Sequence, residues 1–142
     1  SVEVMNEQAT ALGEACARAV EQSGKKVVLV ASHSLSHRHF VEEAPLPEDM
    51  SREHIYNHSQ YVWDMKMVDL MRAGNMREVI DLMPEFTEQT MAETEGGGLT
   101  WMMAAMGHPD YCAEIYGYQS VIGTGNVIAA WDPNADTREV VL

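Results

Sequence analysis

The apolar run Val27–Ala31 constrains the fold most, because it ends abruptly in a stretch of polar side chains. The run shows no alternation of apolar and polar residues, which indicates a strand buried on both faces, as in a parallel sheet covered by helices. Three serines and three histidines follow it in Ser32–His39. Ligands bind in the crevice beyond the carboxyl ends of such strands. We therefore expect these imidazoles to act as acid, base or ligand, with a solvated surface loop as the alternative.

The chain begins with a predicted amphipathic helix. Met5, Ala9, Leu12, Cys16 and Val20 recur at helical spacing and indicate one packed face. Such a face needs a sheet to cover, yet one convincing buried strand follows it, with a second strand region near the end. A parallel sheet of two strands cannot bury both faces of each strand. The pattern therefore predicts a fragment of an α/β domain, or one chain of a split or heteromeric assembly.

The middle of the chain is predicted to be helical after a loop. Residues 41–50 contain two prolines and four acidic residues, which favours a loop that covers the site. Ser51 is a suitable N-cap for a helix that stops near Gly74, Asn75 fits a capping box, and Pro84 can open a further helix. The chain has 11 methionines, most of them in these helices. Methionine at helical spacing is typical of a core or a subunit interface.

The acidic segment before Trp101 is a second segment whose side chains could take part in chemistry. Glu93 and Glu95 precede a glycine triplet at residues 96–98, which predicts a bend and then an apolar helix. A carboxylate at such a bend can point inward, and a solvated helix end is the alternative. Glu114–Trp131 then alternates aromatic, β-branched and glycine residues, which predicts strand, glycine turn and strand.

Composition excludes several classes of partner. The net charge of −13 argues against a surface for nucleic acid or anionic membranes. No apolar run approaches the roughly 20 residues of a membrane-spanning helix, so we expect a cytoplasmic protein. Cys16 and Cys112 lie far apart without CxxC spacing, which argues against a disulfide framework or a zinc knuckle.

Five segments carry a resemblance to a known family: Ser34–Phe40, Glu42–Met50, Trp63–Met65, Leu99–Met102 and Gly117–Asn126. They resemble the type III extradiol ring-cleaving dioxygenases, which include the protocatechuate 4,5-dioxygenase β subunits, and within them the 2-aminophenol 1,6-dioxygenases. The resemblance spans nearly the whole chain and only the family's carboxyl-terminal half. It implies that residues 1–142 are the carboxyl-terminal part of a single α/β domain. In that domain a mixed central sheet is covered by helices, and it is incomplete without an amino-terminal half.

The resemblance also implies a metal site. In the family, two histidines and one glutamate hold Fe(II) and leave open positions for substrate and dioxygen. The alanine–glutamate pair before the tryptophan helix matches Glu93, with Glu95 as the reserve candidate for this ligand. The two histidine ligands are expected in the amino-terminal half. His54 and His58 have the i, i+4 spacing of some metal sites, but no third ligand accompanies them, which favours a packed or solvated role.

By the same resemblance, His37 is the acid–base group that takes a proton from the substrate and later returns it. Imidazole suits both directions of this transfer near neutral pH. His33 and Tyr116 are assigned to substrate binding, with plain packing as the alternative for Tyr116.

The implied function is Fe(II)-dependent extradiol cleavage of a catechol or 2-aminophenol by dioxygen, giving a muconic semialdehyde-type product. The implied partners are the aromatic substrate, dioxygen, and an amino-terminal half or partner subunit in a homo- or hetero-oligomer. The main alternative is a non-catalytic structural subunit or an inactive fragment. Serine hydrolysis by Ser34 or Ser36 with His37 is disfavoured because no GxSxG motif surrounds either serine.

Overall fold

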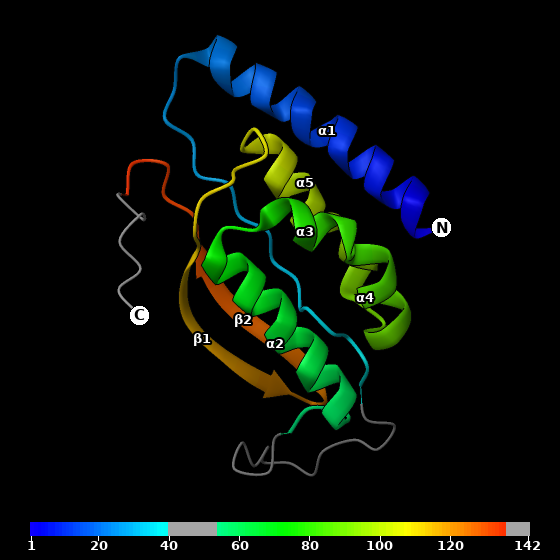
Figure 1. Ribbon diagram of the computed structural model, residues 1–142. Helices are drawn as coiled ribbons and strands as arrows, with labels where there is room; N and C mark the ends of the chain where they lie inside the picture. Colours follow the sequence, from blue (N-terminus) through cyan, green and yellow to red (C-terminus); the bar gives the residue numbers. More distant parts are fainter. Residues whose placement is uncertain (40–53, 136–142) are drawn as a thin grey trace.

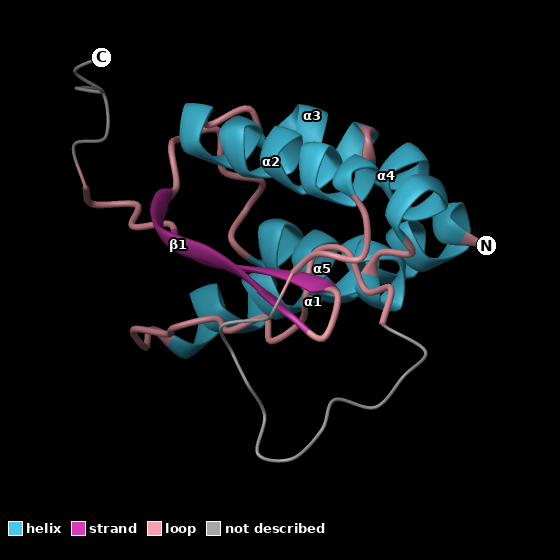
Figure 2. Cartoon of the chain, turned by 90° about the horizontal axis from the view of Figure 1, so that it is seen from below, coloured by secondary structure: helices cyan, strands magenta, loops and turns pink. Residues whose placement is uncertain are grey.

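The computed structural model describes residues 1–39 and 54–135 of the chain (Figure 1). The elements in these residues, in chain order, are α1 (Val2–Ser23), α2 (His58–Ala73), α3 (Met76–Asp81), α4 (Met83–Thr90), the short 3-10 helix η2 (Glu93–Gly96), α5 (Gly97–Ala105), β1 (Glu114–Val121) and β2 (Thr124–Ala130). Figure 1 shows α1 alongside α5, and α2 packed over the two strands and running along them. Helices lie on both sides of the strand pair in Figure 2. The predicted α/β class is confirmed, and the sheet of the described residues is two-stranded and antiparallel.

The long helix α1 packs against α5 through small side chains. Ala9 and Gly13 are its buried residues, whereas Leu12 is 60% exposed. A Cβ at Gly13 would overlap the carbonyl oxygen of Trp101 and lie 2.6 Å from Cβ of Ala104. The predicted helix is confirmed, but the predicted contact face is wrong at Leu12. The glycine lets the two helices approach more closely than a larger side chain would allow.

The strand predicted at Val27–Ala31 is not formed. The segment has no helix or strand assignment, and Val28 and Val30 are 88% and 74% exposed. A strand buried on both faces needs neighbours and covering helices, and the described residues supply neither around this segment. A backbone hydrogen bond to the sheet forms further on, where the N–H of Leu35 donates to the carbonyl oxygen of Gly125 at 2.8 Å.

The core lies between α2, α3, α4, α5 and the strands. Its fully buried large side chains are Phe86, Met67, Met71, Met83 and Met103. The prediction that the methionines fill the core is confirmed for these four, since flexible thioethers fit gaps between short helices.

Several helix ends follow local signals. Helix α2 starts at His58, where the Asn57 side chain accepts from the backbone N–H of Gln60 at 2.8 Å. The predicted start at Ser51 and the predicted loop 41–50 lie outside the described residues. Because the helix starts at His58, His54 does not share its face, and the i, i+4 histidine pair is not formed. Gly74 ends α2 in the left-handed conformation as predicted.

The starts of the two shorter helices, α3 and α4, agree with the sequence signals to different degrees. Asn75 precedes α3, but its side chain makes no capping hydrogen bond. Pro84 lies in the first turn of α4, which confirms that prediction.

The carboxyl-terminal hairpin agrees with its sequence pattern. β1 and β2 pair from Glu114 opposite Ala130 to Val121 opposite Thr124. Ile122 and Gly123 form the turn with φ of 44° and 90°. Both residues therefore lie in the left-handed region that two-residue hairpin turns require. A register shift between Ile115 and Gly117 interrupts the pairing.

No helix of residues 1–39 and 54–135 is long and apolar enough to cross a membrane.

Candidate functional site

The histidine loop and the acidic segment meet at the end of α4. The backbone N–H of Glu93 donates to the carbonyl oxygen of Leu35 at 3.2 Å, and the N–H of His37 donates to that of Thr90 at 3.4 Å. These bonds join two parts of the chain that are distant in sequence. They place the side chains of His37 and Glu93 on the same side of the molecule.

His37 and Glu93 form the centre of the candidate site. Nε2 of His37 lies 3.9 Å from Oε2 of Glu93, and the two side chains are 35% and 29% exposed. The same oxygen of Glu93 accepts a hydrogen bond from the backbone N–H of Ser34. The carboxylate is thus held by the backbone while both side chains stay accessible. A fixed carboxylate beside an imidazole can bind a cation and exchange protons with a bound molecule.

Strained backbone surrounds Glu93. Met91, Thr94 and Glu95 have φ of 54°, 48° and 53°, in the left-handed region that costs about 1–2 kcal/mol for a residue with a Cβ. Gly96 continues in the same region with φ of 75°. A Cβ there would overlap Sδ of Met83, so this position requires glycine. The predicted bend is confirmed, and Glu93, rather than Glu95, is the glutamate that contacts His37. Strain of this kind clusters at functional sites.

The two neighbouring histidines differ in how they are held. Nδ1 of His33 donates to the carbonyl oxygen of Ser34 at 2.6 Å, and a Cβ at Gly98 would lie 2.7 Å from the ring. His33 also lines a small hollow of about 60 Å³ that Leu99 and Val127 help to form. His39 is exposed and its ring meets that of His37 edge-on, with centroids 4.3 Å apart. His33 therefore faces the molecule's interior near the site, and its role in substrate binding stays a prediction.

The structure does not bring Tyr116 to this cluster. Its side chain is 62% exposed, and its hydroxyl donates to Oε2 of Glu114 at 2.8 Å. The register shift in β1 sends Tyr118, not Tyr116, toward the interior. This register shift could not be predicted from the alternation of side chains along the strand, because the sequence signals no bulge there. A role for Tyr116 in substrate binding remains a prediction.

Behind the histidine loop lies a polar network around Asp64. The Asp64 side chain is fully buried. Oδ1 accepts from the backbone N–H of Ser36 at 3.1 Å, and Oδ2 accepts from the Ser36 hydroxyl at 2.7 Å and the Tyr118 hydroxyl at 2.6 Å. The sequence did not single out Asp64 for chemistry. The available signal was a carboxylate on a helix face beside the apolar Met67 and Val68.

Burial dominates the titration of this network. It raises the pKa of Asp64 above the usual value of 3.8, although the hydrogen bonds from Tyr118 and Ser36 oppose the shift. Burial, and then the hydrogen bond to Asp64, raises the pKa of the Tyr118 hydroxyl. The network thus keeps the Asp64 carboxyl group in a buried environment, where its ionisation costs free energy.

In the Asp64→Asn variant we expect one component of the pH dependence of stability to disappear. The raised pKa means that folded Asp64 binds its proton more tightly than unfolded Asp64. The wild type therefore loses stability as the pH rises from about 4 through the folded-state pKa, and Asp64→Asn does not. Urea unfolding of both proteins from about pH 4 to 7 measures the difference, which should grow with pH and then level off. A pH-independent difference would contradict the assignment.

Gly125 is required by the same network. A Cβ at this position would overlap the Asp64 carboxylate and lie 2.5 Å from the Tyr118 hydroxyl oxygen. We expect Gly125→Ala to lower the free energy of unfolding by about 1–3 kcal/mol, the usual cost of overpacking. Gly117→Ala is the matched control, because nothing lies within 4 Å of its added Cβ. Thermal unfolding of the two variants makes the comparison. Equal losses of stability in both would contradict the explanation.

The site suits part of a metal centre. Within residues 1–39 and 54–135, no group of three or more histidine, cysteine, aspartate or glutamate side chains is arranged to hold a metal ion. Glu93 fits the role of a single carboxylate ligand, since it is held in place and accessible.

The serines are arranged differently from those of a hydrolase. The Ser34 hydroxyl donates to Oδ1 of Asn126 at 2.9 Å, and the Ser36 hydroxyl donates to Asp64. Both serine protons are therefore directed away from His37, which would have to accept one of them in a serine nucleophile.

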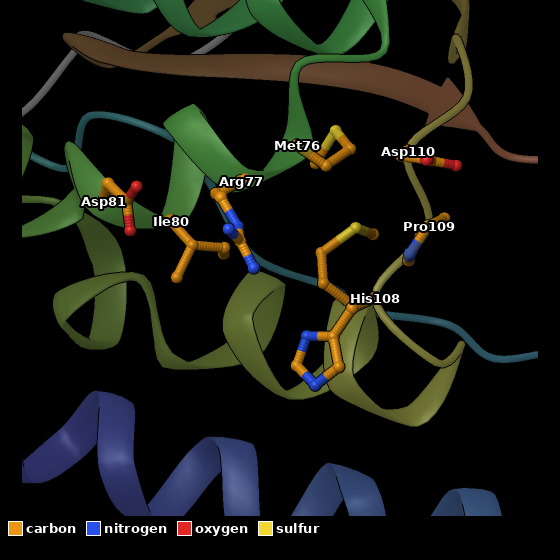
Figure 3. Close-up of a pocket in the computed structure, with 8 residues that line it drawn as sticks. Met76, Arg77, Ile80, Asp81, His108, Pro109 and Asp110 are labelled. Atoms are coloured by element: carbon orange, nitrogen blue, oxygen red, sulfur yellow. The ribbon is translucent and has the colours of Figure 1, made fainter.

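A separate hollow of about 450 Å³ lies between α3 and the turn after α5 (Figure 3). Met76 and Arg77 of α3 line one side, and His108 and Pro109 line the other. Its lining residues do not include His37 or Glu93, so it is distinct from the candidate site.

Comparisons with known proteins identify the family of the chain. Residues 4–129 match the family model described as the catalytic LigB subunit of aromatic ring-opening dioxygenase. The chain is 51% identical over 121 residues to the 2-aminophenol 1,6-dioxygenase beta subunit of Pseudomonas sp, covering 85% of this chain and 40% of that relative. It is 28% identical over 105 residues to the 3,4-dihydroxyphenylacetate 2,3-dioxygenase of Escherichia coli, covering 74% of this chain and 37% of the relative. The chain thus spans about two fifths of the length of these relatives. It belongs to the LigB family of aromatic ring-opening dioxygenases.

Proposed function

We propose that this chain is part of an extradiol dioxygenase that opens the ring of a 2-aminophenol or catechol beside the heteroatom pair, between one heteroatom-bearing carbon and the adjacent carbon outside the pair. The observation that carries the proposal is the pair formed by His37 and Glu93, 3.9 Å apart and partly exposed. Membership of the LigB family supports it. Residues 1–142 are then the carboxyl-terminal part of one α/β domain, completed by an amino-terminal half or a partner subunit.

Glu93 is proposed as one ligand of Fe(II). Once bound, Fe(II) would supply Lewis-acid binding of the aromatic substrate and the redox chemistry that activates dioxygen. The backbone N–H of Ser34 fixes one oxygen of Glu93, which orients the carboxylate. Glu95 is the reserve candidate, and the two histidine ligands belong to the part of the protein beyond this chain.

His37 is proposed as the acid–base group. Its Nε2 accepts a proton from the hydroxyl or amino group of the bound aromatic and later returns it to the opening ring. Oε2 of Glu93 lies 3.9 Å from this nitrogen, so the proposed acid–base group and the proposed ligand are adjacent. The partial exposure of His37 leaves its ring accessible to a substrate.

Among substrates, 2-aminophenol is favoured, because the relative with 51% identity is named for it, whereas the relative with 28% identity is named for a dihydroxyphenylacetate. His33 and Tyr116 are the proposed substrate contacts. The product is then a muconic semialdehyde-type compound. A cytoplasmic location and a homo- or hetero-oligomer complete the proposal.

The alternative is a non-catalytic subunit that serves structure. One observation favours it: the relative with 51% identity is named a beta subunit. Against it stand His37 and Glu93, which a purely structural subunit does not need.

Oxygen uptake tests the proposal. The complete protein, with and without its partner subunit, is loaded anaerobically with Fe(II) and given 2-aminophenol, protocatechuate or 3,4-dihydroxyphenylacetate. Ring-opened product is followed by absorbance. Uptake that is fastest with 2-aminophenol supports the proposal. Activity that appears only with the partner and survives loss of His37 and Glu93 supports the structural subunit instead.

A further inference from the structure

We infer that Asp64 is a positioning residue for His37, acting through Ser36 to fix the backbone from which the imidazole projects. The inference rests on the proposed function, because it assigns proton transfer to His37. It adds a residue on α2 that touches neither the substrate nor Glu93 in that proposal.

The first support is the way Asp64 holds Ser36. The two oxygens of the carboxylate accept from both donors of this serine, the backbone N–H at 3.1 Å and the hydroxyl at 2.7 Å. Both residues are fully buried. Such a two-point attachment fixes the orientation of the Ser36 peptide, and His37 is the next residue in the chain.

The second support is that β2 closes the network from the other side. The backbone N–H of Gly125 donates to the Ser36 carbonyl oxygen at 3.0 Å and is 3.1 Å from its hydroxyl oxygen. Ser36 therefore has its N–H, its carbonyl and its hydroxyl all engaged. The peptide that leads into His37 is held by α2 and β2 together, whereas the N–H of His37 itself donates to the Thr90 carbonyl oxygen over a longer distance, 3.4 Å.

The third support is the chemistry of the carboxylate. Asp64 accepts from three donors at once, those of Ser36 and the hydroxyl of Tyr118. Burial of a charged group is costly, and apolar side chains of similar volume often give a more stable core. A buried carboxylate whose oxygens all accept hydrogen bonds instead fixes a single arrangement of its donors. That geometry is the placement of the histidine loop.

The test is a double-mutant cycle in the complete protein with its partner subunit and 2-aminophenol as substrate. The variants are Asp64→Ala, Asp64→Asn, His37→Ala and the double variant His37→Ala/Asp64→Ala. Thr100→Val is the matched control, because it removes the hydrogen bond of another buried hydroxyl, 3.2 Å from Asn6. The readouts are kcat, KM, iron content and hydrogen exchange of the Ser36 amide.

We expect Asp64→Ala to lower kcat by about 10²-fold, the cost of a misplacement of about 1 Å, with KM and iron content little changed. The Ser36 amide should exchange faster. In the His37→Ala background the same substitution should have no further effect on kcat, because its effect passes through the imidazole. Asp64→Asn should recover most of kcat, since an amide can accept from the Ser36 N–H and donate to the two hydroxyl oxygens. Thr100→Val should leave kcat unchanged.

Additive losses from His37→Ala and Asp64→Ala would overturn the inference, as would loss of iron in Asp64→Ala. If Asp64→Ala does not fold, Ser36→Ala takes its place, with a smaller loss of kcat that also vanishes without His37. A wild-type protein that fails to cleave any ring overturns the proposed function itself. An active wild type with additive losses overturns only the role of Asp64.

Discussion

Replacing His37 by alanine should lower kcat by about 10²- to 10⁴-fold, the usual contribution of a general acid–base group. The loss should occur with iron still bound, because the proposed ligand is Glu93 and not His37. KM for 2-aminophenol should change little if the imidazole acts mainly in the chemical step. Stopped-flow absorbance of the ring-opened product, together with iron analysis of the same samples, provides the measurement.

His108→Ala is the matched control for this experiment. His108 is an exposed histidine on the turn after α5, where Nε2 lies 3.4 Å from Oε1 of Glu14. Its removal deletes one imidazole without touching the histidine loop, so kcat should be unchanged. A His37→Ala protein that loses iron and keeps its activity per bound metal would show that His37 is a ligand instead.

Replacing Glu93 by glutamine should weaken iron binding by at least about 10²-fold, since even groups that only orient a ligand contribute 10- to 100-fold to metal affinity. The amide keeps the size of the side chain and an oxygen that can accept from the N–H of Ser34, so the fold should persist. Iron retained after anaerobic dialysis, and thermal unfolding without iron, separate a loss of metal from a loss of structure.

Glu95→Gln is the matched control for Glu93→Gln. The two glutamates lie two residues apart, and Glu93 is the one of the two that lies beside His37, 3.9 Å from its Nε2. Iron loss confined to Glu95→Gln would transfer the ligand role to Glu95. Full iron retention in both variants would remove the carboxylate ligand from this chain altogether.

The elements that could be predicted from sequence are those encoded locally. The hairpin follows from β-branched and aromatic residues on both sides of Gly123, because two residues with positive φ are sufficient to reverse the chain. The left-handed end of α2 at Gly74 and the start of α4 near Pro84 follow from single residues. In each case the deciding interactions lie within a few positions in the chain.

The elements that could not be predicted depend on distant neighbours. Val28 and Val30 have strand-forming side chains, yet a strand forms only where another backbone offers hydrogen bonds. Leu12 satisfies the helical period, but the close approach at Gly13 turns the helix so that Leu12 faces solvent. Periodicity predicts that a face exists and leaves open which residues are nearest the partner helix.

The candidate site shows the same division. The family resemblance pointed to His37 and Glu93, and the structure places them together. Asp64 was missed because one carboxylate on a helix is usually solvated. Its burial depends on donors from Ser36 and Tyr118, which come from other parts of the chain. Tyr116 and Tyr118 are equivalent in sequence pattern, and only the register shift distinguishes them.

The attachment of the histidine loop to Gly125 has a consequence for how the protein is made. Leu35 and Ser36 leave the ribosome before their backbone partner in β2, which is synthesised about 90 residues later, and contacts of such sequence separation form slowly. A nascent chain that ends before Gly125 therefore contains His37, Asp64 and Glu93 without the strand that fixes their geometry. Competence for chemistry then arises only as β2 docks, so chains that stall or end before β2 carry the site's residues in an unassembled form.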